Sequence, residues 1–241
     1  KLASGSRIVR ASDDAAGLAI STKLTGDITA LKQAATNASQ ASSIMQVADG
    51  GLARVSDVLQ RMKALAAQAL SGTVTNTERA YIDAEYQALD LEVAGIRDTT
   101  SFNGSLLIGG GYNENFFVGL GAAGVVNNIA ADLSGVTVAP VTGAVGTAAN
   151  AAAAFILVTA AIGVLAADRA VVGALISRFD TRGAQVSTSI ENTEAANSTL
   201  KDVDLALEQT KLVTANVLTQ AAVSALSQAN QIPQTLLRVL Q

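Results

Sequence analysis

Apolar residues follow a helical spacing through the early part of the chain. From Leu24 to Met62 they recur in steps of three, four or seven residues. Residues at these steps share one face of an α-helix, so the pattern predicts that residues 13–70 form largely one helix, with a weak point at Gly50 and Gly51. At 1.5 Å per residue this helix would be roughly 85 Å long, far longer than a small globular domain is wide. The pattern therefore indicates a rod or a helix in a bundle.

A second helix is predicted after a turn-like, polar run of residues. Thr77 is its expected N-cap, and apolar residues then follow in steps of four and three from Ile82 to Ile96. This spacing predicts an antiparallel partner for the first helix. The periodicity ends near Asn103-Gly104, a pair that readily supplies the two positive-φ residues of a type I′ hairpin turn. Helix is therefore expected to give way to strand at this point.

The composition changes in the middle of the chain. Residues 104–146 hold ten of the 20 Gly residues, and Asp132 is the one charged residue within 115–167. Short runs at 116–118 and 136–138 are typical of strands between Gly turns. We therefore expect a small β-rich insert here rather than a charged, flexible linker.

The stretch from Ala151 to Ala167 is 17 residues long and carries no charge. This length is close to the lower limit for a membrane-spanning helix. The helical pattern, however, continues through Asp168 and Arg169 into charged sequence, which favours a helix buried in protein. We therefore predict no membrane insertion, and purification without detergent would exclude the membrane alternative.

The last apolar series runs from Val186 through Leu226 toward Pro233. Both ends of the chain are therefore predicted to be long helices that enclose a β-like centre. Terminal helices that are far apart in sequence bury their apolar faces most simply against each other. The predicted fold class is mainly α: a long antiparallel helical coiled-coil bundle formed by the N- and C-terminal segments, with a small β-rich central insert.

Composition narrows the function classes. Of the 241 residues 49% are hydrophobic but only 3% are aromatic, and there is no Cys, His or Trp. Thiol nucleophiles, Ser–His relays, thiolate zinc sites and imidazole ligands are thereby excluded. A glycosidase-type carboxylate pair is the enzyme alternative that remains open, but the aromatic platforms usual in sugar sites are scarce. We predict no catalytic, cofactor-binding or metal-binding residues. The net charge of −4 opposes binding to a phosphate backbone, and no nucleic-acid partner is expected.

Ser12, Asp13 and Asp14 stand where the first helix is predicted to begin. Ser12 is expected to cap the helix, and two carboxylates in its first turn would each contribute about 0.3 to 1 kcal/mol by facing the positive end of the dipole. A metal or acid–base pair is the alternative. Neighbouring side chains on a helix diverge, however, and no periodic series of oxygen ligands surrounds these residues. Their predicted role is to start the helix.

Several segments of the chain resemble bacterial flagellin. The N-terminal match runs from Leu2-Ala3-Ser4-Gly5 to Ile20, and the later matches follow in the order of the family. The matching segments are residues 2–8, 12–20, 59–66, 102–104, 178–179, 190–192, 202–204 and 228–237. The resemblance implies a structural subunit that self-assembles into the flagellar filament, without catalysis. It also implies an extracellular location, export without a cleavable signal peptide, and a further N-terminal helix before Lys1.

The resemblance divides the chain into regions. It assigns residues 1–20 to the junction between the inner (D0) and outer (D1) helical domains, 21–108 and 168–204 to a D1-like bundle, 109–167 to a short variable insert that is part β and part Ala-rich helix, and 205–241 to a D0-like C-terminal helix. The implied partners are further copies of the chain, an export chaperone and a cap protein.

The resemblance also implies a contact surface on the first two helices. Arg61, Leu65 and Gln68 share one helix face by their spacing, Lys63 lies beside it, and Glu85 comes from the antiparallel helix. The simplest explanation is a solvated face with an incidental apolar residue. In flagellins the matching positions form a patch that binds a vertebrate Toll-like receptor and contacts a neighbouring subunit.

A surface binding module is the alternative function. In this hypothesis the Gly-rich insert recognises an extracellular ligand such as a polysaccharide through Asn113, Asn115, Asn127 and Asn128. Deletion of the insert separates the two hypotheses, because assembly would survive and ligand binding would be lost.

Overall fold

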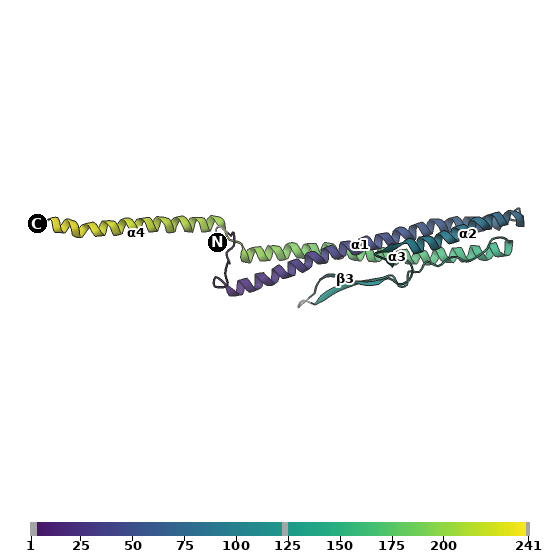
Figure 1. Cartoon of the computed structure of the whole chain (residues 1–241), viewed down its shortest axis with the longest axis horizontal. Coiled ribbons are helices and arrows are strands. Elements are labelled where there is room, and N and C mark those ends of the chain that lie inside the picture. The colour runs from purple at the N-terminus through teal and green to yellow at the C-terminus, as the bar shows by residue number, and fades with distance from the viewer. Residues whose placement is uncertain (1–3, 122–124, 240–241) are drawn as a thin grey trace. The chain divides into compact units, whose positions relative to one another are not determined.

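The computed structural model describes residues 4–121 and 125–239, and side chains as far as residue 230. This part of the chain forms two compact units (Figure 1). The bundle unit is residues 29–190, and the terminal unit combines the described residues of 1–28 with those of 191–241. The elements are α1 (Ala15–Ala69), α2 (Asn76–Thr99), β1 (Ser101–Phe102), β2 (Ser105–Leu106), β3 (Asn113–Leu120), β4 (Val126–Asp132), α3 (Ala148–Lys201) and α4 (Leu205–Val239).

The first predicted helix is confirmed as α1, which runs without interruption through Gly50 and Gly51. Gly51 is not a weak point in the helix. A Cβ atom there would lie 2.5 Å from the Thr100 hydroxyl oxygen, so the missing side chain lets the end of α2 approach α1 closely.

The core of the bundle unit is a seam between α1, α2 and α3, which lie side by side in Figure 1. On α3 the buried residues follow one another in steps of three, four or seven, as in a coiled coil. Segments more than 100 residues apart in sequence thus share one core. Its members include Ala38, Ala41, Met45, Leu52, Val55, Leu59 and Met62 of α1, Tyr86 and Val93 of α2, and Ala151, Ala154, Val158, Leu165, Val172, Leu175 and Phe179 of α3.

A capping box starts α2 two residues earlier than predicted. Thr75 is the N-cap, because its hydroxyl oxygen accepts from the Glu78 N–H and the Glu78 carboxylate accepts from the Thr75 N–H at 2.7 Å. The bond from the Thr75 N–H, and after it a bond that the Thr75 hydroxyl donates to the same carboxylate oxygen at 2.8 Å, lower the pKa of Glu78. The prediction of Thr77 as the cap is therefore wrong. The predicted apolar steps on α2 are confirmed, since Tyr86 and Val93 are buried.

A buried arginine closes the turn between α1 and α2. The Arg79 guanidinium donates to the carbonyl oxygens of Ala69 at 2.7 Å and Ser71 at 3.0 Å, and to the side-chain oxygen of Asn76 at 2.9 Å. It thus satisfies carbonyls that the end of a helix leaves without intrahelical donors.

The strands form two antiparallel hairpins. In the β1–β2 hairpin Asn103 has φ 48° and Gly104 has φ 80°, which confirms the predicted turn. The strand predicted at 116–118 is confirmed within β3. The strand predicted at 136–138 is wrong, because Thr137 makes only an isolated bridge with Gly109.

The β3–β4 hairpin packs onto the helical core. Val118 and Ile129 are buried in the same cluster as the α1 and α3 seam, and the rings of Phe116 and Phe179 meet edge to face with centroids 5.7 Å apart. The insert therefore belongs to the bundle unit. Because α3 is continuous from residue 148 to 201, the proposed boundary between 167 and 168 falls within a helix. The fold is mainly α with small antiparallel strands in the centre, as predicted.

Among the described residues, α3 is the one helix long and apolar enough to cross a membrane by length and composition. Its 18-residue window has a mean hydropathy of 2.1, and 22% of that window is buried. The sequence predicted a helix buried in protein, but only one side is buried, at Ala151, Ala154, Val158 and Leu165. The outer side is apolar and faces outward at Ile156.

In the terminal unit the two ends of the chain pair through backbone. Arg7 N–H donates to the Lys201 carbonyl at 2.7 Å, and Val203 N–H donates to the Gly5 carbonyl at 3.1 Å. This pairing interrupts the helix that the sequence predicted to continue past residue 200. Asp204 then caps α4 by accepting from the Leu207 N–H at 3.0 Å.

We expect Phe179→Ala to lower the free energy of unfolding of the bundle unit by about 3–5 kcal/mol, because it leaves a cavity in the seam. Urea denaturation followed by circular dichroism measures this change. Val171→Ala on the exposed side of α3 is the control, with an expected change of within about 0.5 kcal/mol. Equal losses for the two variants would contradict the assignment of the core.

Candidate functional site

The candidate contact surface lies on α1 and α2 within the bundle unit. Arg61 of α1 donates twice to the same carboxylate oxygen of Glu85 on α2, at 2.8 Å from Nε and 2.6 Å from the terminal nitrogen. The side chains are 57% and 45% exposed. The structure therefore brings these two predicted residues together as an ion pair at the surface.

Lys63 and Gln68 lie differently. The Lys63 ammonium is 5.2 Å from the centre of the Phe155 ring of α3, a cation–π distance, and the side chain is half-buried. Gln68 is exposed on α1. Lys63 thus connects α1 to α3, whereas Gln68 faces outward.

Leu65 does not belong to the exposed surface. It is only 2% exposed and is part of the core cluster. The steps of three and four that bury Leu59 and Met62 reach Leu65 and Ala66 next, so this signal was present in the sequence. The expectation that Leu65 shares an exposed face with Arg61 is therefore wrong, because the seam continues to the end of α1.

Ser12, Asp13 and Asp14, predicted to start the first helix together, have different roles in the structure. Asp14 is the N-cap of α1, since its carboxylate accepts from the Gly17 N–H at 2.8 Å. The Asp13 carboxylate accepts from the N–H groups of Val9 and Arg10, at 3.1 and 3.0 Å, and so closes the preceding turn. Ser12 is not the cap, because α1 begins at residue 15.

The asparagines of the alternative hypothesis lie on the β3–β4 hairpin. Cross-strand partners share a face, and Asn115 pairs with Ala130 while Asn128 pairs with Phe117. Asn113, Asn115 and Asn128 are exposed, whereas Asn127 is half-buried. This is the usual alternation of a ribbon packed on helices. Nothing in this geometry or in the relatives supports ligand binding.

The acidic residues make no candidate metal centre. Among residues 4–121 and 125–239 no group of three or more His, Cys, Asp or Glu is placed to hold a metal ion.

Comparison with known proteins gives one consistent result. Family models match residues 1–112, as the bacterial flagellin N-terminal helical region, and residues 156–240, as the C-terminal helical region. Flagellin of Halalkalibacterium halodurans is 35% identical over 250 residues, and that of Bacillus subtilis is 35% identical over 276 residues. The whole chain is covered in both cases, with 90% and 91% of the relatives. The crystal structure of Bacillus cereus flagellin matches with a TM-score of 0.56 at 26% identity, over 67% of this chain and 94% of that one.

The different positions of Arg61 and Leu65 predict different effects on stability. Leu65→Ala is expected to cost about 2–5 kcal/mol because it opens a cavity in the core. Arg61→Ala removes an exposed ion pair and is expected to cost no more than about 1 kcal/mol. Urea denaturation of both variants tests this difference. A larger loss for Arg61→Ala than for Leu65→Ala would contradict the burial of Leu65.

Proposed function

The chain belongs to the bacterial flagellin family, and from this membership we propose how its surfaces act in the flagellar filament. It is a structural filament protein and not an enzyme. Its function is self-polymerisation into the extracellular filament. The proposal concerns which surfaces make the contacts and which further partners they meet.

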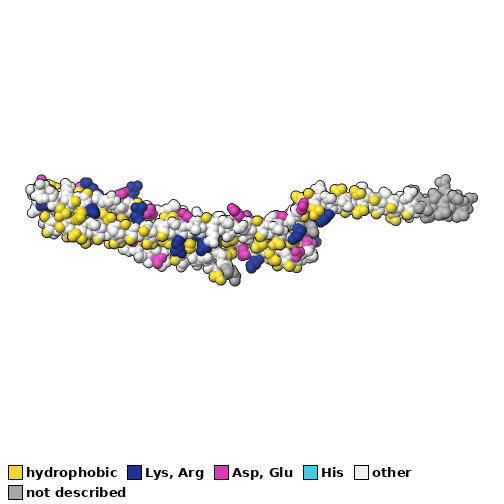
Figure 2. Space-filling view, turned by 180° about the vertical axis from the view of Figure 1, so that it is seen from behind, with side chains coloured by type: hydrophobic (Ala, Val, Ile, Leu, Met, Phe, Trp, Pro, Cys, Tyr) yellow, Lys and Arg dark blue, Asp and Glu magenta, His cyan; other side chains and the backbone are white. Residues whose placement is uncertain are grey.

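The apolar surface of α4 is the observation that carries the proposal. Eight large apolar side chains of this helix are 49–65% exposed, and Figure 2 shows such side chains on the visible part of α4. At about 100° per residue, Leu205 and Val223 lie on the side opposite Leu207 and Leu218. The eight residues are Leu205, Leu207, Leu212, Val213, Val217, Leu218, Val223 and Leu226.

A helix that is apolar on all sides is normally buried. We assign α4 to the D0-like inner domain, where helices from more than one direction cover it as copies assemble. We assign the other regions as the family resemblance implies. Residues 1–20 form the junction, 21–108 and 168–204 form the D1-like bundle, and 109–167 form an insert that packs on that bundle.

Repeated head-to-tail contact between copies produces an open helical array when the rotation does not close. No chemical step is needed. The seam stiffens the bundle unit, and the exposed apolar side chains of α4 are the ones offered to neighbouring copies.

Three further partners stay predictions. An export chaperone and a cap protein follow from the family alone, as does export without a cleavable signal peptide. A vertebrate Toll-like receptor is the third, and the surface offered to it is smaller than the sequence suggested. It consists of Arg61, Gln68 and Glu85, with Lys63 at its edge.

Charge on either side of α4 is expected to block assembly. Leu218→Asp and Val223→Asp lie on opposite sides of the helix, and each would place a carboxylate in an apolar contact. Seeding the protein with filament fragments, followed by electron microscopy, measures elongation. Leu218→Met and Val223→Ile keep both sides apolar and are the controls, with elongation expected to stay normal. Normal elongation by both aspartate variants would contradict the role of α4.

Arg61→Ala is expected to reduce Toll-like receptor signalling by the soluble protein, because it removes an exposed cation without disturbing the core. A reporter-cell assay measures this response. Arg54→Ala is the control, since Arg54 forms a more exposed ion pair with Asp57 on α1, with side chains 79% and 69% exposed. Signalling that is reduced equally by the two variants, or by neither, would discard Arg61 as a receptor contact.

A further inference from the structure

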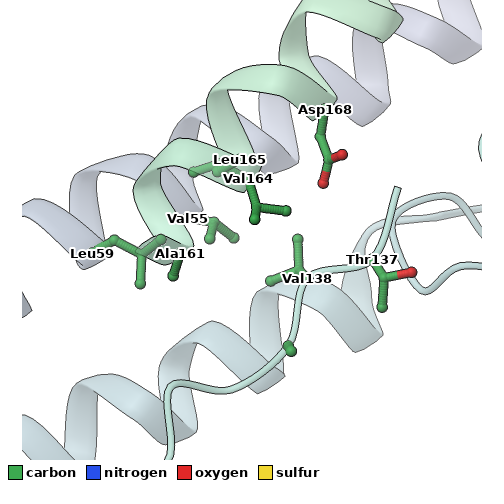
Figure 3. A pocket seen from close by; sticks show the side chains of 9 residues that line it. Val55, Leu59, Thr137, Val138, Ala161, Val164, Leu165 and Asp168 are labelled. Carbon is green, nitrogen blue, oxygen red and sulfur yellow. The ribbon is translucent and has the colours of Figure 1, made fainter. Parts of the chain in front are cut away.

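A partly open cavity of about 120 Å³ lies in the bundle unit between α1, α3 and the segment at 137–139 (Figure 3). Apolar side chains form most of its wall. An apolar cavity of roughly 150 Å³ is large enough to hold a benzene ring, so this one accommodates a short carbon chain. The wall includes Val55, Leu59, Val138, Ala161, Val164 and Leu165.

One charged group faces this apolar space. Asp168 of α3 is only 9% exposed, and Figure 3 shows its carboxylate directed toward the gap between α3 and Val138. No hydrogen bond or ion pair joins the carboxylate to the described residues. The adjacent cation, Arg169, is turned to Asp49 instead, at 2.9 Å. Burial raises the pKa of Asp168 above its ordinary value.

A carboxylate that is largely buried and has no partner among the described residues costs free energy, and a matching cation recovers part of that cost. The cavity therefore offers two kinds of complementarity next to each other. A hydrocarbon chain fits its wall, and a positive group fits the carboxylate at its edge.

We propose that this cavity binds a primary alkylammonium group, with the carbon chain against the α1 and α3 side chains and the ammonium on the Asp168 carboxylate. A bare metal ion is a poor match, because hard cations require several oxygen ligands. A neutral chain of the same length leaves the carboxylate unpaired. The same chemistry occurs in a lysine side chain of a second copy and in a free small amine.

A lysine of a second copy as the origin of the ammonium group rests on the proposed function, since it requires contact between copies. The outer side of α3 near the cavity is apolar at Leu157, Val164 and Val171, each about half exposed. A lysine stem would continue this apolar contact into the cavity, since lysine buries its methylene groups while its ammonium seeks a polar partner.

The test is a titration of the unassembled full chain with n-butylammonium chloride, followed by methyl NMR of its Val and Leu residues. Saturable shifts at the Val164 and Leu165 methyl groups are expected. Asp168→Asn is expected to weaken binding by roughly tenfold or more, because it removes the charge partner. Glu92→Gln, which removes an exposed carboxylate of α2, is the matched control and leaves the affinity unchanged. n-Butanol is the neutral probe and does not distinguish the wild type from Asp168→Asn.

A second variant tests the cavity separately from the charge. Ala161→Leu fills the space and is expected to abolish the shifts while Asp168 remains. The proposal is overturned if butylammonium produces no saturable shift in the wild type. It is also overturned if Asp168→Asn or Ala161→Leu binds as well as the wild type.

Seeded assembly distinguishes the two sources once binding is established. A higher critical concentration for Asp168→Asn, with inhibition of wild-type assembly by butylammonium, identifies a lysine of a second copy. Unchanged assembly identifies a free amine. The NMR titration measures amine binding by the unassembled chain. Its result therefore stands even if the protein fails to form filaments and the proposed function is wrong.

Discussion

Close packing of α1 against α3 holds the bundle unit together. Small side chains line much of the contact, with Ala38 and Ala41 on α1 and Ala151 and Ala154 on α3 fully or almost fully buried. Alanines allow helix axes to approach, so dispersion and apolar burial act along a long, narrow interface. Polar contacts fix its register, since Ser42 donates to Asp180 at 2.8 Å. A rod of this kind is stiff because each part of it is held by a segment distant in sequence.

The same constraint explains how the chain presents itself to other copies. The seam uses one side of α3, and on the other side Leu157, Val164 and Val171 stay about half exposed. On α4 apolar residues lie on every side, as expected of a helix that is completed by its neighbours. The proposed function thus depends on a division between apolar residues that fold one copy and apolar residues that join copies. The ion pair between Arg61 and Glu85 adds charge to the exposed surface of α1 and α2, whose inner sides pack in the seam.

Features set by local sequence were the predictable ones. The steps of α1 and α2 and the Asn103-Gly104 turn depend on residues a few positions apart, and each was predicted. The spacing of Thr75 and Glu78 also indicates a capping box in the sequence, but the N-cap was predicted at Thr77 instead. Burial of Leu65 followed from extending the seam by one step. The unpaired Asp168 carboxylate was not predictable, because its burial depends on residues 137–139 folding back onto α3. The isolated bridge at Thr137 depends likewise on a distant partner, Gly109.

Crosslinking between α1 and α3 tests the shared seam most directly. The chain has no cysteine, so Ser42→Cys with Asp180→Cys places a unique thiol pair where the two side chains now form a hydrogen bond. Dilute oxidation of the full-length double variant, with gel mobility as the readout, is expected to give an intramolecular disulfide in nearly all molecules. Either single variant provides the uncrosslinked reference. Double-variant molecules that stay reduced, or that link only between chains, would contradict the packing of these two distant segments as one rod.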